Sequence, residues 1–228
     1  MGLKLAEVVP WGRSLAEYRR MFDLTEADLL GSLLDCGGGP ASFNAELTQQ
    51  GYSVISCDPL YQFSPAEIAE RIAATCDQIL QGVEANLQNY VWQDIQSPAH
   101  LGEVRMVAMT EFLADFPEGL REGRYQPIAL PCLPFAPQQF DLALCSHLLF
   151  TYSDHLSGEF HLAAIEEMGR VAQEVRIFPL LNISGEVSPL LAPVLKELQH
   201  SGYQTEICPV AYEFQRGGDR MLRVRKPV

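Results

Sequence analysis

The chain has no long apolar run and no recognisable leader. None of its 228 residues lies in a run of the roughly 18 to 20 apolar residues that a membrane-spanning helix needs. The first ten residues mix Lys4 and Glu7 with apolar neighbours and contain no apolar core of a secretion signal. The sequence therefore predicts no membrane segment, and we expect the protein in the cytoplasm.

Basic residues are scarce relative to acidic ones. Sixteen Lys and Arg against 29 Asp and Glu give a formal net charge of −13. A broad surface for nucleic acid needs clustered Lys and Arg that face the phosphates. The one basic cluster, residues 216–226, is diluted by two glycines and Asp219. The charge balance therefore argues against nucleic acid as a partner and favours a small-molecule substrate.

Cysteine patterns typical of metal or redox sites are missing. The six cysteines form no C-x-x-C pair and show no metal-ligand spacing. Cys57 and Cys145 lie in apolar stretches, where a free cysteine behaves as a small buried apolar side chain. His155, Glu159 and His161 are close in sequence but lack a known ligand spacing. We therefore expect reduced thiols, as in a reducing compartment, and no metal site.

Apolar runs typical of buried strands alternate with segments typical of helices. Parallel strands are expected at 33–36, 52–57, 125–130, 140–146 and 174–181, and an antiparallel hairpin at 203–214 and 221–225. Helices are expected at 14–22, 41–50, 156–171 and 188–202. Right-handed crossovers between parallel strands place helices on both faces of the sheet. The predicted fold is α/β, a doubly wound and mostly parallel seven-stranded sheet with a C-terminal antiparallel hairpin.

Two further amphipathic helices interrupt this alternation. Residues 64–67, Ser-Pro-Ala-Glu, combine a capping box with proline at the first helical position. A second helix is expected to begin near Pro98. A minimal doubly wound fold needs only a short unit at this point. We therefore predict one domain over residues 1–228, with an inserted helical lid at about 61–123.

A glycine-rich turn joins the first expected strand to the next helix. Asp35 precedes Gly37, Gly38 and Gly39, which have no Cβ to keep a ligand away from the backbone. Ligands of parallel α/β sheets bind beyond the carboxyl ends of the strands. Asp58 ends the next strand, where its carboxylate can accept hydrogen bonds from both ribose hydroxyls. The pattern predicts a nucleoside-containing ligand, although a plain connection with a solvated aspartate is the alternative.

Two other nucleotide-binding motifs fit this turn less well. A dinucleotide fingerprint G-x-G-x-x-G that began at Gly37 would need glycine at position 42, which is serine here. No G-K-[ST] follows the glycines, and this excludes a phosphate-binding P-loop. An NAD-binding enzyme therefore remains the second interpretation.

These features resemble the class I S-adenosylmethionine-dependent methyltransferases over most of the chain outside the helical insert. Residues 33–39 resemble the family's first motif, an acidic residue and a glycine turn that hold the methionine part of the cofactor. Asp58 matches the ribose-binding acid, and residues 133–135 with 140–146 resemble the segment that leads into the fourth strand. The resemblance implies a Rossmann-like fold with a reversed last strand and S-adenosyl-L-methionine as the cofactor.

The same resemblance implies positions for other cofactor contacts. Pro59 and Leu60 would flank the adenine. The family's aspartate before its "LPF" segment is missing here, so Cys132 and Leu133 would contact the adenine through their backbone. Arg13 could bind the methionine carboxylate through charge-assisted hydrogen bonds, while a surface arginine beside a helix start is the plainer interpretation.

Residues just after the fourth strand usually face the methyl group in this family. Here they include Ser146, assigned to the cofactor, and the catalytic candidates His147 and Tyr152. Methyl transfer needs an in-line nucleophile and, where required, a general base. His147 is the candidate base because imidazole titrates near neutral pH. A histidine that only holds the end of the strand by hydrogen bonds is the alternative.

The predicted function is methyl transfer from S-adenosylmethionine to a small or modest-sized acceptor. The N-P-P-[YF] turn of nucleic-acid aminomethyltransferases is absent, and residues 146–149 occupy its place. A non-catalytic protein that binds S-adenosylmethionine is the alternative, because one fold hosts many functions. The identity of the acceptor, the methylated atom and the oligomeric state do not follow from the sequence.

Overall fold

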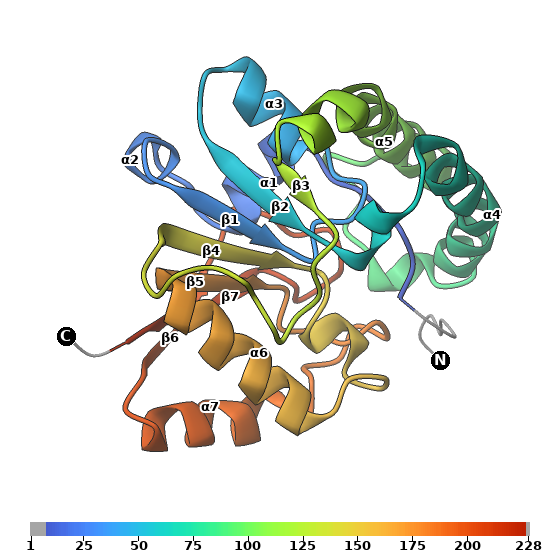
Figure 1. Ribbon diagram of the computed structural model, residues 1–228. Coiled ribbons are helices and arrows are strands. Elements are labelled where there is room, and N and C mark those ends of the chain that lie inside the picture. Colours follow the sequence, from blue (N-terminus) through green and yellow to red (C-terminus); the bar gives the residue numbers. More distant parts are fainter. Residues whose placement is uncertain (1–7, 227–228) are drawn as a thin grey trace.

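The computed structural model describes residues 8–226, which form a seven-stranded sheet with helices on both faces (Figure 1). The strand order is β3-β2-β1-β4-β5-β7-β6. The strands are β1 (Leu33–Cys36), β2 (Val54–Cys57), β3 (Tyr125–Gln126), β4 (Phe140–Ser146), β5 (Ala172–Phe178), β6 (Gln204–Pro209) and β7 (Arg220–Arg225). β1 to β5 are parallel, and β7 is antiparallel to both β5 and β6. The predicted α/β fold with its C-terminal antiparallel hairpin is confirmed.

Most of the helices begin after a serine or threonine whose side chain caps the first turn. They are α1 (Leu15–Met21), α2 (Glu26–Leu29), α3 (Phe43–Gln49), α4 (Pro65–Glu84), α5 (Pro98–Arg121), α6 (Gly158–Val171) and α7 (Leu191–His200). The capping box predicted at Ser64 with Glu67 forms, and a second one forms at Ser14 with Glu17. A third capping box, at Thr25 with Asp28, starts the short helix α2, which the sequence analysis missed. Short 3₁₀ turns occupy Pro59–Gln62, Leu87–Asn89 and Phe150–Tyr152.

Alternate residues of the central strands pack into two separate cores. Leu34, Ala143 and Val175 pack against α6 and α7 on one face of the sheet. Leu33 and Leu142 point to the opposite face and pack against α1 and α3. This division follows from the two-residue period of a strand, and a parallel sheet needs cover on both faces.

The register of the sheet aligns the carboxyl ends of its three central strands. Cys36 of β1 pairs with Cys57 of β2 on one side and with Cys145 of β4 on the other. The residues that follow these strands therefore meet at one edge of the sheet.

Helices α4 and α5 lie side by side next to the β3 edge of the sheet (Figure 1). Ile68 and Ile72 of α4 pack against Phe112 and Phe116 of α5, together with Tyr125 of β3. These two helices and the turns around them account for residues 61–123. Their role as a lid stays a prediction.

Two strands, β3 and β6, are much shorter than the sequence predicted. β3 ends at Gln126 because the next residue, Pro127, has no N–H to continue the ladder. The strand expected over 203–214 ends at Pro209 for the same reason. Residues 210–219 form the connection to β7 instead, and Tyr212 packs on the core face that carries α1 and α3.

No helix within residues 8–226 is long and apolar enough to cross a membrane. Residues 1–7, on which the expectation of no leader partly rests, lie outside the described part of the chain. The cytoplasmic location stays a prediction.

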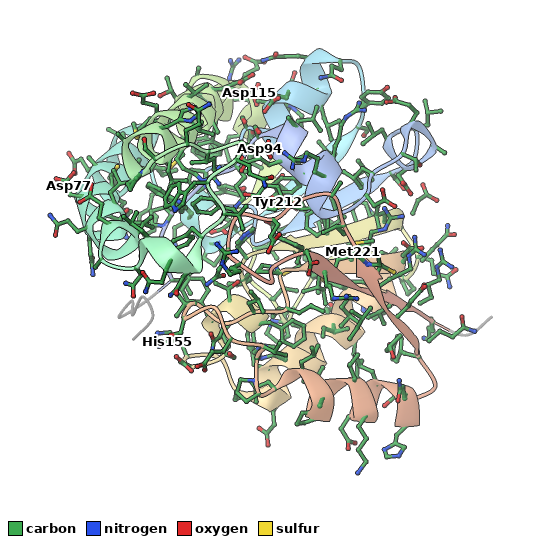
Figure 2. The ribbon with its side chains drawn as sticks, turned by 180° about the vertical axis from the view of Figure 1, so that it is seen from behind. Asp77, Asp94, Asp115, His155, Tyr212 and Met221 are labelled. Carbon is green, nitrogen blue, oxygen red and sulfur yellow. The ribbon has the colours of Figure 1, made fainter. Side chains whose placement is uncertain are left out.

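A buried ion pair joins α1, α5 and the 210–219 loop. Arg105 of α5 is 1% exposed, and its Nη1 donates to Glu17 Oε2 of α1 at 2.6 Å. The hydroxyl of Tyr212 donates to Glu17 Oε1 at 3.0 Å, and Figure 2 shows this tyrosine at the meeting point of the loop and the helices. Although burial opposes ionisation, the charge of Arg105 and its hydrogen bond hold the pKa of Glu17 below its usual value. Three segments far apart in the sequence are thereby held together.

We predict that Arg105→Met lowers the free energy of unfolding by about 3 to 5 kcal/mol, because Glu17 is left buried without a counter-ion. The matched control Arg121→Met, at an exposed position of the same helix, should change it by less than about 0.5 kcal/mol. Urea unfolding measures both. Equal effects of the two substitutions would contradict the role given to the buried pair.

Candidate functional site

A cavity of about 560 Å³ lies at the carboxyl ends of the parallel strands. Its floor is made by the residues that follow β1, β2 and β4, in the order 37–39, 58–60 and 146–148. Its outer wall comes from residues 8–13, from α4 and from the 210–219 loop. This is the position at which open α/β sheets bind ligands.

The glycine turn after β1 forms the tightest part of the floor. Gly37 has a φ of +70° and donates its N–H to the carbonyl of Cys57 at 2.8 Å. A Cβ at this residue would lie 2.6 Å from Cδ2 of Leu148, so only glycine fits both the backbone and its neighbour. At Gly38 a Cβ would collide with the Asp35 carboxylate. The turn therefore presents bare backbone to the cavity.

Asp58 joins the turn after β1 to the segment after β2. Its Oδ2 accepts the N–H of Gly39 at 3.0 Å, and its Oδ1 accepts the N–H of Leu60 at 2.7 Å. Burial raises the pKa of Asp58, while these two backbone hydrogen bonds oppose the shift. Each carboxylate oxygen has a second lone pair. The side chain lines the cavity and can accept hydrogen bonds from a vicinal diol.

Asp35 supports the turn from behind. Its carboxylate is 1% exposed and accepts hydrogen bonds from the Tyr18 hydroxyl at 3.2 Å and the Ser56 hydroxyl at 3.1 Å. Burial raises its pKa to about 7, against the effect of these two hydrogen bonds, and the charge of Asp58 adds to the rise. The sequence analysis placed Asp35 among the cofactor-binding residues, whereas in the structure it does not line the cavity.

Ser146 and His147 lie at the end of β4, on the side of the cavity away from Asp58. The Ser146 hydroxyl is 2.9 Å from Nδ1 of His147, and the imidazole packs edge-on against Phe178. Burial, together with the positive charges of Arg13 and Arg105, holds the pKa of His147 well below its usual value. The imidazole is therefore neutral at pH 7, and the same burial and charges make it a weaker base than an ordinary histidine.

Arg13 lines the cavity without a carboxylate partner. Its Nη1 donates to the carbonyl of Trp11 at 2.9 Å, and its Nε is buried with no hydrogen bond. Within residues 8–226 it forms no ion pair, and burial and Arg105 both lower its pKa. Arg13 is half-buried and directly precedes the N-cap of α1, and its role toward a ligand stays a prediction. A desolvated cation of this kind favours a bound anion.

Tyr152 fastens the N-terminal segment across the cavity. Its hydroxyl accepts the N–H of Val9 at 3.2 Å, and both residues line the cavity. Tyr152 and His147 are therefore brought to the same cavity, as the sequence analysis expected, together with Pro59 and Leu60.

The structure places Cys132 and Leu133 outside the cavity. Cys132 is exposed, and the buried Leu133 packs against α6, with its N–H bound to Glu167. Residues 128–130 line the cavity in their place. The reason is the early end of β3 at Gln126, after which the chain crosses the cavity and then turns away. Cys132 and Leu133, which were expected to contact the adenine, therefore do not line the cavity.

Part of the outer wall is aromatic, and two of its residues, Tyr90 and Phe214, could not be singled out from the sequence. Trp11, Tyr90 and Phe214 all line the cavity although they are far apart in the sequence. The rings of Tyr90 and Phe214 are stacked with centroids 4.9 Å apart. No local pattern marks these residues, because each belongs to a segment that is distant from the strands.

The sheet order and the reversed β7 are those of the class I methyltransferase fold. No family model matches the chain. Similar solved structures include a magnesium protoporphyrin IX methyltransferase of Synechocystis PCC 6803 with bound SAM, at 17% identity over 86% of this chain and 69% of that chain, with a TM-score of 0.41. A SAM-dependent methyltransferase of Aquifex aeolicus is 15% identical over 91% of this chain and 90% of that chain, with a TM-score of 0.43.

One curated relative matches the chain along its length. The chain is 33% identical over 229 residues to the uncharacterized protein MJ0045 of Methanocaldococcus jannaschii, covering 98% of this chain and 99% of that protein. The chain belongs to the same family as this archaeal protein.

The raised pKa of Asp35 predicts a pH-dependent stability. The pKa of Asp35 is about 7 in the folded state, above the ordinary 3.8. The contribution of Asp35 to the free energy of unfolding is therefore fully present below pH 3.8 and is lost as pH rises through 7. Between pH 5 and pH 8 this loss is on the order of 2 to 3 kcal/mol.

Asp35→Asn should remove this loss, so the free energy of unfolding of the variant should rise relative to that of the wild type between pH 5 and pH 8. Urea unfolding of both proteins at the two pH values gives the difference, and the titration of all other groups cancels in the comparison. A constant difference between variant and wild type would show that Asp35 does not titrate in this range.

Proposed function

We propose that the cavity binds S-adenosyl-L-methionine and that the protein transfers its methyl group to a small acceptor. The observation that carries this proposal is the arrangement of Asp58 and the glycine turn. The carboxylate lies at the end of β2, is fixed by Gly39 and Leu60, and faces the same cavity as the bare backbone of Gly37. A nucleoside with a ribose diol and an extended 5′ substituent fits these two features.

The two ends of the cavity suit the two ends of this cofactor. Asp58 accepts hydrogen bonds from the ribose hydroxyls, and Leu60 and residues 128–130 flank the adenine. At the other end, Arg13 binds the methionine carboxylate. Its buried Nε without a partner and the glycine turn, whose backbone lines the cavity without side chains, are the features of this chain that fit the group. When bound, the cofactor supplies an electrophilic methyl group on a sulfonium.

His147 is the general base of the proposed reaction. Its neutral imidazole takes the proton from the acceptor's nucleophilic atom, and the hydroxyl of Ser146 holds the ring in place. Tyr152 keeps the N-terminal segment over the cavity, which excludes water from the acceptor side. Positioning and exclusion of water are the main contributions that a protein can make to methyl transfer.

Calorimetric titration with S-adenosylmethionine, S-adenosylhomocysteine and NAD tests the cofactor assignment. We expect the two adenosyl compounds to bind, and Asp58→Ala to weaken them by about tenfold or more, because hydrogen bonds to a charged group are lost. The control Asp77→Ala removes an exposed carboxylate on the outer side of α4 (Figure 2) and should leave both affinities unchanged.

Preference for NAD, or no adenosyl binding, would overturn the proposal. Adenosyl binding without turnover for any acceptor would leave the non-catalytic alternative.

The state of His147 gives a second test that needs no acceptor. Histidine ring signals followed by NMR should show His147 neutral at pH 6. Because the positive charge of Arg13 lowers the pKa of His147, Arg13→Gln should raise that pKa. The control Arg19→Gln, outside the cavity and paired with Glu26, should not. An unchanged titration in Arg13→Gln would mean that burial and Arg105 determine the pKa of His147, and that Arg13 lies too far from the base.

A further inference from the structure

Helix α4 turns one face toward the cavity. Arg71, Ala74, Thr75, Ile79 and Val83 line it at the three- and four-residue spacings of a helix face. From Arg71 to Val83 this face is about 18 Å long. Its middle is made of small side chains, its far end is aliphatic, and its near end carries a single cation.

The charged groups around the cavity are unevenly distributed. Among residues 8–226, the lining contains Arg13 and Arg71 but only one acidic side chain, Asp58. Asp58 is engaged at the glycine turn by two backbone N–H groups. Asp77 of α4 points outward (Figure 2). In a protein with a net charge of −13, an anionic ligand needs such a local cation to approach.

Arg71 is oriented but not neutralised. Its guanidinium carbon lies 3.9 Å from the centroid of the Phe63 ring, which holds the planar group against the cavity wall. Within the described part of the chain it makes no ion pair. Glu67, one turn earlier, acts on it only through the electrostatic field, because the carboxylate of Glu67 caps the helix at Ser64. The guanidinium N–H groups therefore remain available at the cavity mouth.

The far end of the α4 face opens on the aromatic wall. Ile79 and Val83 pack in one cluster with Tyr90, Leu101 and Phe214. None of these side chains carries a charge. An apolar ring or chain gains from burial here, whereas an ionic group would lose its hydration without a partner.

From these features we infer that the acceptor is an apolar monoanion. Its anionic group binds Arg71, and its apolar body lies along Ala74 and Thr75 toward Tyr90 and Phe214. Cationic acceptors are disfavoured, because two arginines face the cavity. This inference rests on the proposed function, in which Arg13 is occupied by the cofactor carboxylate and Arg71 is left for the acceptor.

The experiment uses 2-naphthoate and 2-naphthamide, which have the same ring system and differ in one negative charge. Each is titrated calorimetrically into the full-length protein saturated with S-adenosylhomocysteine. We expect the naphthoate to bind about tenfold more tightly than the naphthamide. Arg71→Gln should reduce this preference to less than about twofold. The control Arg121→Gln, at an exposed helix position outside the cavity, should preserve it.

A second variant tests the apolar track independently of charge. Ala74 is exposed on α4 and lines the cavity, so Ala74→Phe fills the track without disturbing the core. This substitution should weaken the binding of naphthoate and of naphthamide alike, by about tenfold, and leave the affinity for S-adenosylhomocysteine unchanged.

Equal binding of the two probes, a preference that persists in Arg71→Gln, or full binding in Ala74→Phe would each overturn the inference while the cofactor site stands. No binding of S-adenosylhomocysteine to the wild type would overturn the proposed function, and this inference with it.

Discussion

The cavity has an outer wall because of one buried ion pair. Arg105 and Glu17 are 88 positions apart, and Tyr212, which completes the group, is 195 positions from Glu17. Strands β1, β2 and β4 form a floor without any help from this group. The group then holds α5 and the 210–219 loop against α1, which places an aromatic wall over that floor. The sheet thus supplies a generic nucleoside site, and the ion pair encloses the space beside it.

Much of the fold could be predicted from local sequence patterns. Two examples are the capping box of Ser64 with Glu67 and the apolar run of β4. Each involves residues close in the sequence, so its pattern can be interpreted without knowing the rest of the chain. The glycine turn and Asp58 could also be recognised from the sequence around them. Their meeting depends only on two adjacent parallel strands that end at the same level, which the βαβ pattern implies.

Other parts of the site could not be predicted because they depend on distant contacts. Arg13 resembled a surface residue, and its burial follows from the packing of residues 8–13 under α4 and beside Tyr152. Residues 128–130 line the cavity in place of Leu133 because β3 ends before Pro127, which has no N–H for the ladder. Phe214 was expected within a strand, but β6 ends at Pro209. Phe214 therefore lies in the 210–219 loop, where its ring stacks on Tyr90. In each case a tertiary contact or one missing N–H outweighed the local pattern.

The close approach of Gly37 to Leu148 constrains how this family can vary. Gly37 has a positive φ, and a Cβ at the same position would lie only 2.6 Å from the Leu148 side chain. A smaller residue at 148 would relieve the collision but not the backbone strain, so no single neighbouring change makes room for a side chain at 37. Side chains of α4 and of the 210–219 loop, which also line the cavity, can change in size and charge while the turn stays as it is.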